Sequence, residues 1–365
     1  MGGASFRHLA HSGQAKSIEK QPYSVCGITI PHLLDRPLAS FETPASRALR
    51  IRKAVDDIKI GPHPERERSE QSMDALFSSK IDQGSPEAAM DGTTAATAVR
   101  SENTPVLLEE RTEGVLRLVM NRPAQRNALS VALMSALQES LERAAADQAC
   151  RVIIIAGAGP AFCAGHDLRE LRSEDDVSEA RRETYRRIFA QCSALMLQIV
   201  RLPKPVIAEV HGIATAAGCQ LVATCDLAIA AAEARFATPG VNIGLFCSTP
   251  MVALSRAIGR KPVMEMLLTG ELIDAASAKA LGLVNRVVPA AELTAAAAAL
   301  AQQIAGKSAL TLKIGKEAFY RQAELGLADA YKYASEVMTT NMLAEDAAEG
   351  IDAFLEKRPP VWRDA

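Results

Sequence analysis

Several features that mark common protein classes are absent from this 365-residue chain. Its seven cysteines are scattered without a Cys-x-x-Cys pair, which argues for reduced intracellular thiols and against a disulfide framework. The longest apolar runs, at 152–156 and 295–301, are far shorter than a membrane span. The net charge of −2 gives no basic excess for nucleic acid or an anionic membrane, and the six histidines show no metal-ligand spacing. We therefore expect a cytoplasmic protein that binds neither nucleic acid, membrane nor metal.

Residues 1–103 differ in composition from the rest of the chain. They combine weak hydrophobic periodicity with charge clusters such as Arg66-Glu67-Arg68 and with many prolines. We interpret 1–103 as a mostly disordered extension with a short helix near 46–58. The first eighteen residues contain no acid and faintly resemble a mitochondrial transit peptide. An incidental extension is the favoured interpretation, and the mitochondrial matrix is the alternative location.

A folded domain is expected over 104–365. Strands are predicted at 106–109 and 114–120, around a charged turn at 110–113, and the Ser130 N-cap should begin a helix that ends near Ala146. Leu133, Leu137 and Leu141 lie on one face of that helix. Further strands are predicted at 151–156, 206–210 and 227–230, and Ala-rich helices at 290–306 and 308–325. Strands that alternate with helices predict an α/β fold.

Several short motifs follow one another in a fixed order from residue 121 onward. They are Asn121-Arg122-Pro123, Asn127-Ala128-Leu129, Ala164-Gly165-His166-Asp167-Leu168, Ala216-Ala217-Gly218-Cys219-Gln220, Cys225-Asp226-Leu227, Gly282-Leu283-Val284-Asn285 and Glu349-Gly350. In this order they resemble the enoyl-CoA hydratase/isomerase (crotonase) superfamily over roughly 104–365. Each motif alone is common, and it is their order that carries the resemblance.

This resemblance implies a fold, a ligand and an assembly. The fold would be α/β, the crotonase (ClpP-like) spiral of ββα units, with a core at 104–300 and a C-terminal helical trimerisation region at 301–365. The ligand would be an acyl-CoA thioester of fatty-acid or other lipid metabolism, and an active protein would be a hydratase-like lyase. Coenzyme A would enter as part of the substrate, with no separate cofactor. The family's packing implies a homotrimer or a dimer of trimers.

The resemblance also assigns an oxyanion hole to two backbone N–H groups, those of His166 and Ala217. Reactions of the family place negative charge on the thioester oxygen, and losing one preorganised donor typically costs about 10²–10³ in rate. Ala217 would open a helix at 217–225, whose N-terminus adds unpaired N–H groups and partial positive charge. Taken alone, 216–218 indicates only tight packing. Together with the 164–168 motif, it favours the oxyanion hole.

Further contacts to coenzyme A and substrate are implied by the same correspondence. They involve Arg126, Ala128, Leu129, Ala164, Gly165, Asp167, Leu168, Gly218, Pro239 and Gly244. Asp167 has an alternative role as a helix-capping carboxylate. Lys313, Lys316 and Lys357 are candidates for the phosphates of coenzyme A, although a solvated surface charge is the simpler interpretation of each.

Both acid–base positions of a hydratase are degenerate in this chain. The family's two glutamates correspond to Gln220 and Gly240. A glutamine can hold a water molecule but cannot accept its proton, and positioned acid–base groups contribute about 10²–10⁴ each. The segment 241–249 offers no replacement carboxylate. Ordinary hydratase turnover is therefore doubtful, and isomerase, hydrolase and dehalogenase chemistry is weakened for the same reason.

Four alternatives remain open at this stage. The His166 imidazole is one candidate proton-transfer group. Cys247 is a candidate nucleophile, but it lacks an evident base because His211 is expected in a turn. Decarboxylation of a malonyl-type thioester needs only the oxyanion hole, and decarboxylases of the superfamily resemble this chain at 164–168 and 239–244. The last alternative is a non-catalytic acyl-CoA binding protein.

Overall fold

The computed structural model describes residues 104–172 and 179–365. The predictions made for 1–103, which are the disordered extension, the helix near 46–58 and the transit-like beginning, lie outside the described residues. No helix within the described ranges is both long and apolar enough to cross a membrane.

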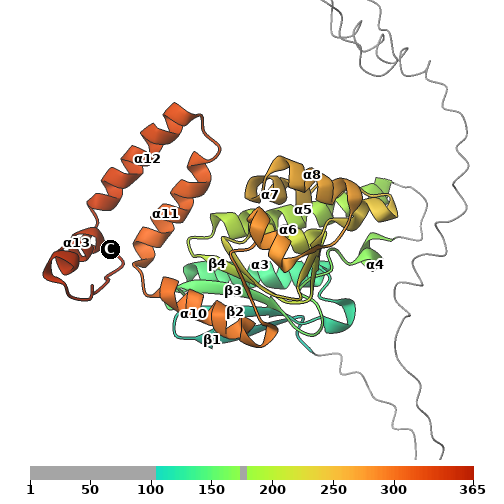
Figure 1. Cartoon of the computed structure of the whole chain (residues 1–365), viewed down its shortest axis with the longest axis horizontal. Helices are drawn as coiled ribbons and strands as arrows, with labels where there is room; N and C mark the ends of the chain where they lie inside the picture. Colours follow the sequence, from blue (N-terminus) through green and yellow to red (C-terminus); the bar gives the residue numbers. More distant parts are fainter. Residues whose placement is uncertain (1–103, 173–178) are drawn as a thin grey trace, which may run out of the picture. The chain divides into compact units, whose positions relative to one another are not determined.

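A six-stranded sheet, in the order β1-β2-β3-β4-β6-β9, forms the centre of the domain (Figure 1). Its strands are β1 Leu107–Thr112, β2 Val115–Met120, β3 Val152–Gly157, β4 Val206–Val210, β6 Leu227–Ala231 and β9 Arg286–Val288. β1 pairs antiparallel with β2, and the remaining pairs are parallel. The prediction of a turn at 110–113 was wrong, since β1 continues to Thr112. Its charged residues are tolerated because β1 is an edge strand with four exposed positions.

Helices cover both faces of this sheet. One core cluster joins α3 Val131–Ala146, α5 Glu179–Arg201 and α6 Ala217–Thr224 to one face. Ser130 caps α3 as predicted, its Oγ accepting from the N–H of Leu133 at 3.1 Å. The leucines that were predicted to share one face of α3 are all fully buried. A second cluster joins α10 Leu293–Ala305 to the opposite face. The expected boundary between a core at 104–300 and a helical region at 301–365 therefore falls inside α10.

The domain also contains a smaller sheet of three strands. It contains β5 Ile213–Thr215, β7 Arg235–Ala237 and β8 Ile273–Asp274, in the order β5-β7-β8. The remaining short elements are η1 Pro123–Gln125, α4 Leu168–Leu171, η2 Pro239–Ile243, α7 Pro250–Ala257, α8 Arg260–Thr269, α9 Ala275–Leu281 and η3 Ala290–Glu292. The small sheet was not predicted from the sequence. It matters because β5 leads directly into α6 and β7 leads directly into η2.

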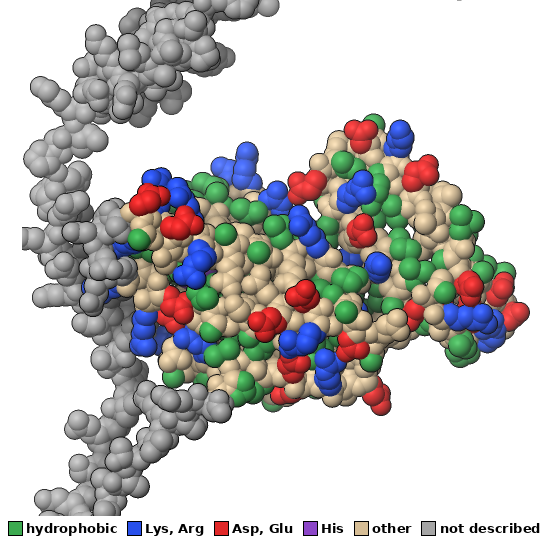
Figure 2. Space-filling view, turned by 180° about the vertical axis from the view of Figure 1, so that it is seen from behind, with side chains coloured by type: hydrophobic (Ala, Val, Ile, Leu, Met, Phe, Trp, Pro, Cys, Tyr) green, Lys and Arg blue, Asp and Glu red, His purple; other side chains and the backbone are tan. Residues whose placement is uncertain are grey.

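Three helices follow α10: α11 Ala309–Gln322, α12 Leu327–Met342 and α13 Glu345–Glu356. Neither α11 nor α12 contains a buried residue. Large apolar side chains are exposed from α11 through α13, including Phe319, Leu327, Tyr331, Leu343 and Phe354. Figure 2 shows hydrophobic side chains gathered over this part of the molecule. The Lys316 ammonium fastens α11 to the core through an ion pair of 2.7 Å with Asp226.

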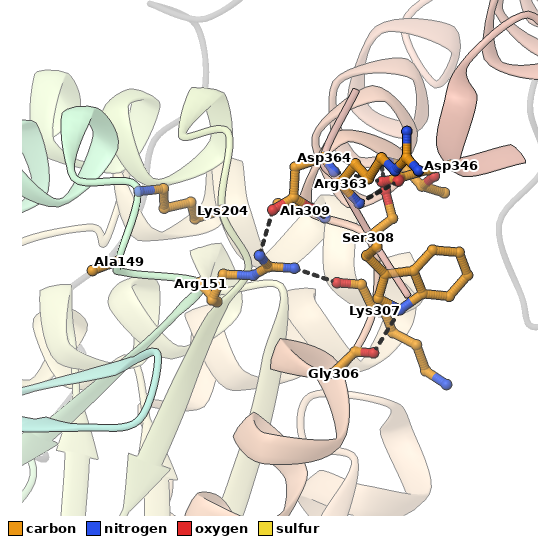
Figure 3. A network of polar contacts seen from close by, with 12 residues as sticks. Ala149, Arg151, Lys204, Gly306, Lys307, Ser308, Ala309, Asp346, Arg363 and Asp364 are labelled. Atoms are coloured by element: carbon orange, nitrogen blue, oxygen red, sulfur yellow. Dashed lines mark hydrogen bonds and ion pairs between the residues drawn. The ribbon is translucent and has the colours of Figure 1, made fainter. Parts of the chain in front are cut away.

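The last residues of the chain fold back onto the start of β3 and α11 (Figure 3). The Arg151 guanidinium pairs with Asp364 at 2.6 Å and also donates to the carbonyl of Lys307. The Trp362 indole donates to the carbonyl of Gly306 at 2.9 Å. The Asp346 carboxylate accepts from the N–H groups of residues 363 and 364. These bonds fix the tail between the sheet and the C-terminal helices.

Candidate functional site

The two motifs that the sequence analysis singled out, 164–168 and 216–220, lie side by side. Cys163 forms a parallel bridge with Ala214, and the N–H of Thr215 donates to the carbonyl of Cys163 at 2.9 Å. A Cβ on Gly165 would stand 3.4 Å from the nitrogen of Ala217. A Cβ on Gly218 would overlap the carbonyl of Cys163. Glycine at 165 and 218 therefore permits a backbone approach that a side chain would prevent.

The N–H groups of His166 and Ala217 are both available for a ligand. Leu129 bonds to the residues flanking His166, donating to Gly165 at 2.7 Å and accepting from Asp167 at 3.2 Å. The N–H of His166 points away from Leu129 and meets no acceptor in the described part of the chain. Ala217 is the first residue of α6, and the first bond of that helix is made by Gln220. Its N–H is thus one of the unpaired donors of a helix N-terminus, and the pair can stabilise an anionic oxygen.

Ala216, which precedes α6, has a strained backbone. Its φ of 50° and ψ of −118° belong to a region that favours glycine. The conformation is held by a hydrogen bond of 2.9 Å from its N–H to the carbonyl of Ala237 on β7. Strain of this kind collects at functional sites because the surrounding structure must impose it. Here it orients the first peptide of α6, which carries the Ala217 N–H.

The His166 imidazole packs against α5. Its ring meets Phe189 of α5 edge to face, with 5.5 Å between the ring centroids. Burial lowers the pKa of His166, and the backbone of Leu129 offsets part of that change. Both ring nitrogens are buried, and neither makes a well-directed hydrogen bond within the described residues. The imidazole is therefore neutral at pH 7 and has unused hydrogen-bonding capacity.

Gln220 and Gly240, the residues that the resemblance aligns with acid–base groups, differ in their surroundings. Gln220 is 4% exposed, and its Oε1 has no hydrogen-bond partner among the described residues. Gly240 is enclosed: a Cβ there would lie 2.7 Å from the carbonyl oxygen of Leu245 and 2.9 Å from the Sγ of Cys247. A side chain at position 240 would therefore meet the loop that follows it.

Cys247 is not activated as a nucleophile, and His211 does not serve as its base. Cys247 is buried, and burial raises the pKa of its thiol. The Nε2 of His211 interacts with the carbonyl of Gly159 at 2.8 Å, so this ring is engaged elsewhere. The structure therefore does not support Cys247 as a thiolate. The described residues also contain no cluster of three or more His, Cys, Asp or Glu that could hold a metal ion.

A polar framework behind the site was missed in the sequence analysis. Asn127, fully buried, accepts from the N–H of Arg122 at 2.9 Å and donates to the carbonyls of Ala158 and Ala161. The Arg122 guanidinium pairs with Asp167 at 2.7 Å. Asp167 also caps α4, as the alternative interpretation predicted, by accepting from the N–H of Arg169. Asn127 begins the Asn127-Ala128-Leu129 motif, and its place there could have indicated a structural role.

The other predicted contact residues are spread around the same region. Leu129 and Ala128 are buried, whereas Leu168 is 55% exposed. Arg126 is exposed, Ala164 and Pro239 are half-buried, and exposed Gly244 is the left-handed C-cap of η2. Lys316 is excluded as a phosphate ligand because its ammonium donates to Asp226 and to two backbone carbonyls. Lys313 and Lys357 remain exposed.

A cavity of about 1320 Å³ adjoins the site between α5, α6, α7 and α11. Gln220 lines it, together with apolar side chains that include Met196, Val222, Val252 and Phe319. This cavity gives the side chain of Gln220 access to space that an apolar ligand can occupy.

Comparisons with known proteins show which family the chain resembles. The enoyl-CoA hydratase/isomerase family model matches residues 110–365. The chain is 47% identical over 261 residues to mitochondrial enoyl-CoA hydratase domain-containing protein 3 of Xenopus laevis, covering 72% of this chain and 87% of that protein. It is 36% identical to 2,3-dehydroadipyl-CoA hydratase of Escherichia coli, covering 70% and 98%.

Solved structures give the same assignment. An enoyl-CoA hydratase of Mycobacterium smegmatis has a TM-score of 0.68 and 52% identity, covering 71% of this chain and 99% of that one. Human enoyl-CoA hydratase domain-containing protein 3 has a TM-score of 0.67 and 46% identity, covering 70% and 100%. The crotonase fold expected from the motifs is confirmed. The chain belongs to the enoyl-CoA hydratase/isomerase family.

Proposed function

We propose that this protein binds acyl-CoA thioesters and stabilises negative charge on the thioester oxygen without a carboxylate base. The observation that carries the proposal is the pair of unpaired N–H groups on His166 and Ala217. Donors fixed in place need no reorganisation when charge develops on an oxygen, which is why such pairs are effective. The ligand class is supported by the names of relatives that act on CoA thioesters.

Ordinary hydration of an enoyl thioester fits the site poorly. Gln220 is a neutral amide, and Gly240 has no room for a side chain. The His166 imidazole, whose pKa is lowered by burial, packs against Phe189. Chemistry that needs no carboxylate base fits better than hydration does.

Decarboxylation of a malonyl-type thioester is the second candidate. It proceeds through an enolate once carbon dioxide leaves, so it requires charge stabilisation and no base. The specific observation in its favour is the filled position at Gly240, since the missing group is the one this reaction does not use. A protein that binds the thioester without converting it would use the same site.

The charge-stabilising role can be tested with acetoacetyl-CoA, whose enolate absorbs differently from its keto form. We expect binding to the full chain to increase the enolate fraction, and Ala217→Pro to weaken that effect by about 10²-fold because proline has no N–H. Leu327→Pro is the control, since Leu327 is the exposed first residue of α12 and follows an extended Gly326. Binding without an enolate increase would contradict the proposal.

Thermal unfolding without ligand is measured for both variants, because proline at 217 also restricts Ala216.

Incubation with malonyl-CoA and methylmalonyl-CoA then separates the candidates. Release of carbon dioxide supports a decarboxylase, and binding without product supports a binding protein. Hydration of crotonyl-CoA at the rate of a two-glutamate relative would contradict the exclusion of hydratase chemistry.

The compartment and the assembly are part of the same proposal. Relatives at 44–47% identity are named as mitochondrial, which favours the mitochondrial alternative over the cytoplasmic expectation. The exposed apolar residues of α11–α13 favour self-association as a trimer or a dimer of trimers. Fractionation of tagged protein and light scattering of the purified chain would test the two points, respectively.

A further inference from the structure

We propose that the tail, residues 358–365, fixes the hinge between α10 and α11 and thereby keeps α11 in place as one wall of the cavity of about 1320 Å³. Release of the tail then lets α11 move away and opens the cavity. The hinge is the connection formed by residues 306–309. This inference does not rest on the proposed acyl-CoA function, because neither its evidence nor its test involves a thioester.

α11 is held by a few directional bonds and not by apolar packing. It contains no buried residue, although Phe319 and Tyr320 line the cavity. Bonds from the Lys316 ammonium and the Tyr320 hydroxyl to Asp226 attach the middle of the helix to the core. A helix with so little buried apolar surface opens locally at a low cost in free energy. What holds its first turn therefore decides whether it stays beside the cavity.

The tail and one arginine hold the first half of the hinge (Figure 3). The Trp362 indole donates to the carbonyl of Gly306 at 2.9 Å. The Arg151 guanidinium donates to the carbonyl of Lys307 while it pairs with Asp364 of the tail. Both carbonyls follow the end of α10, which packs on the sheet. The hinge cannot turn without breaking these bonds.

The second half of the hinge is held through the N-terminus of α11. The Asp364 carboxylate accepts from the N–H of Ala309, the first residue of α11, at 2.7 Å. Ser308 is the N-cap, and its hydroxyl bonds to the buried Asp346 carboxylate. Asp346 in turn accepts from the N–H groups of residues 363 and 364. The tail thus serves the capping groups of α11 both directly and through Asp346.

The backbone of the tail is strained at the residue that makes these bonds. Asp364 has a φ of 59°, in the left-handed region that residues other than glycine rarely adopt. Such a conformation persists only where the surrounding structure imposes it. Here the surrounding structure consists of Arg151 and Ala309, which bind the two oxygens of the same carboxylate. Removing those two bonds should therefore release the tail.

Two cysteines can report whether α11 moves. Cys225 lines the cavity and is 8% exposed, and burial raises the pKa of its thiol. Cys192, on α5, is fully buried and is not part of the cavity wall. A thiol reagent should reach Cys225 when α11 moves away, but Cys192 only when the core itself opens.

The test is alkylation of the folded full chain by iodoacetamide, with Cys225 and Cys192 quantified separately by peptide mass spectrometry. Asp364→Ala removes both carboxylate bonds, and alanine fits the φ of 59° poorly. We expect Cys225 to react about 5- to 10-fold faster than in the wild type, the factor that a helix cap supplies, with an unchanged rate at Cys192. Asp364→Asn keeps an oxygen for the N–H of Ala309 and tolerates a left-handed backbone, so its acceleration should be smaller.

Arg363→Ala is the matched control in the same tail. The Arg363 side chain is 74% exposed in a pair with Glu345, whereas its bond to Asp346 comes from the backbone N–H and is kept in the variant. Cys225 should therefore react at the wild-type rate. An acceleration in Arg363→Ala as large as that in Asp364→Ala would overturn the proposal.

Hydrogen exchange gives a second measurement that uses no cysteine. In Asp364→Ala the amides of 309–322 should exchange faster than in the wild type, while those of 206–210 in β4 should not change. Equal acceleration at Cys225 and Cys192 overturns the proposal, because the tail would then stabilise the whole fold and not the hinge. An unchanged rate at Cys225 overturns it as well. If Asp364→Ala does not fold, Asp364→Asn decides by the same two criteria.

Discussion

The Cβ of Ala216 lies 2.9 Å from the point that a Cβ on Gly165 would occupy. Gly165 and Ala216 are therefore close neighbours, and each precedes a candidate oxyanion donor, His166 and Ala217 respectively. A side chain at residue 165 would push these two segments apart. Gly165 also has a φ of 98°, a conformation that L side chains rarely adopt.

Gly165→Ala is expected to separate the two donors. The added methyl meets Ala216 and the carbonyl of Thr215 at 3.1 Å, and the positive φ adds strain. We expect a loss of about 2–3 kcal/mol in the free energy of unfolding and loss of the acetoacetyl-CoA enolate signal. Urea titration and the spectral assay measure the two effects. Wild-type enolate formation in this variant would show that the spacing is not critical.

Ala216→Gly should act in the opposite direction. Glycine accepts the φ of 50° and ψ of −118° without strain, and this outweighs its greater entropy in the unfolded chain. We expect the free energy of unfolding to rise by about 0.5–1 kcal/mol, with charge stabilisation retained. Chemical denaturation checks the value. A lower stability would mean that the methyl group of Ala216 contributes more by packing than its backbone loses by strain.

Gly240→Glu should not restore a hydratase. Its side chain would begin within contact of the Leu245 carbonyl and the Cys247 sulfur. We expect a loss of about 2 kcal/mol or more in stability and no gain in crotonyl-CoA hydration, even when combined with Gln220→Glu. Gln220→Glu alone is the control, because residue 220 already has a side chain of that size. Hydration by the double variant at the rate of a natural hydratase would contradict this reasoning.

Asn127→Asp should unfold the loop behind the site at neutral pH. Aspartate keeps the shape of asparagine but replaces an amide that donates to two carbonyls, at 2.8 Å from Ala158 and 2.7 Å from Ala161. Burying an unpaired charge opposite two carbonyl oxygens should cost about 3–5 kcal/mol. Asn121→Asp, whose amide makes one exposed bond to Pro105, should cost far less. Equal melting temperatures for the two variants would refute the role of Asn127.

Acid should release the C-terminal tail. The Arg358 guanidinium and the N–H of Val361 lower the pKa of Glu349 from 4.5 to about 2. Because the unfolded chain takes up this proton first, the stabilisation is complete above pH 4.5 and disappears as the pH falls toward 2. The chain's single tryptophan, Trp362, contacts Gly306 and reports docking by its fluorescence. Glu349→Gln should show weaker docking at pH 7 and a flatter acid titration.

Glu356→Gln is the matched control for this titration. Glu356 also pairs with Arg358, at 2.6 Å, but it is exposed and accepts no backbone N–H of the tail. It should keep the wild-type fluorescence profile. If Glu356→Gln gave a profile as flat as that of Glu349→Gln, the acid response would belong to both carboxylates that pair with Arg358 and not to Glu349 alone.

Much of the fold was accessible from local pattern. α3, β4 and α6 were predicted to within one or two residues, because a capping serine, a short apolar run and a small-residue motif mark them directly. β5, β7 and β8 were missed. They contain three, three and two residues, and only pairing between distant segments defines strands so short.

The candidate site divides in a similar way. The motifs predict an oxyanion hole at the N–H groups of His166 and Ala217, because the family correspondence concerns backbone position. They could not show that Gly240 is filled, since the obstructing Leu245 carbonyl and Cys247 sulfur come from the loop that follows. The sequence also could not show that the buried Thr238 hydroxyl has no hydrogen-bond partner among the described residues, because a threonine before Pro239 ordinarily indicates a cap.

The Asp226 carboxylate joins three elements that are far apart in the sequence. It accepts from the N–H of Val206 at the start of β4, from Lys316 and from the Tyr320 hydroxyl. In the folded state its position thus depends on the pairing of β4 with β6 and on the docking of α11. Because the C-terminal helices are synthesised last, we expect them to dock after β4 and β6 have paired. Their docking should be the final and most readily reversed step of folding, so that hydrogen exchange in α11 would be faster than in β4 or β6.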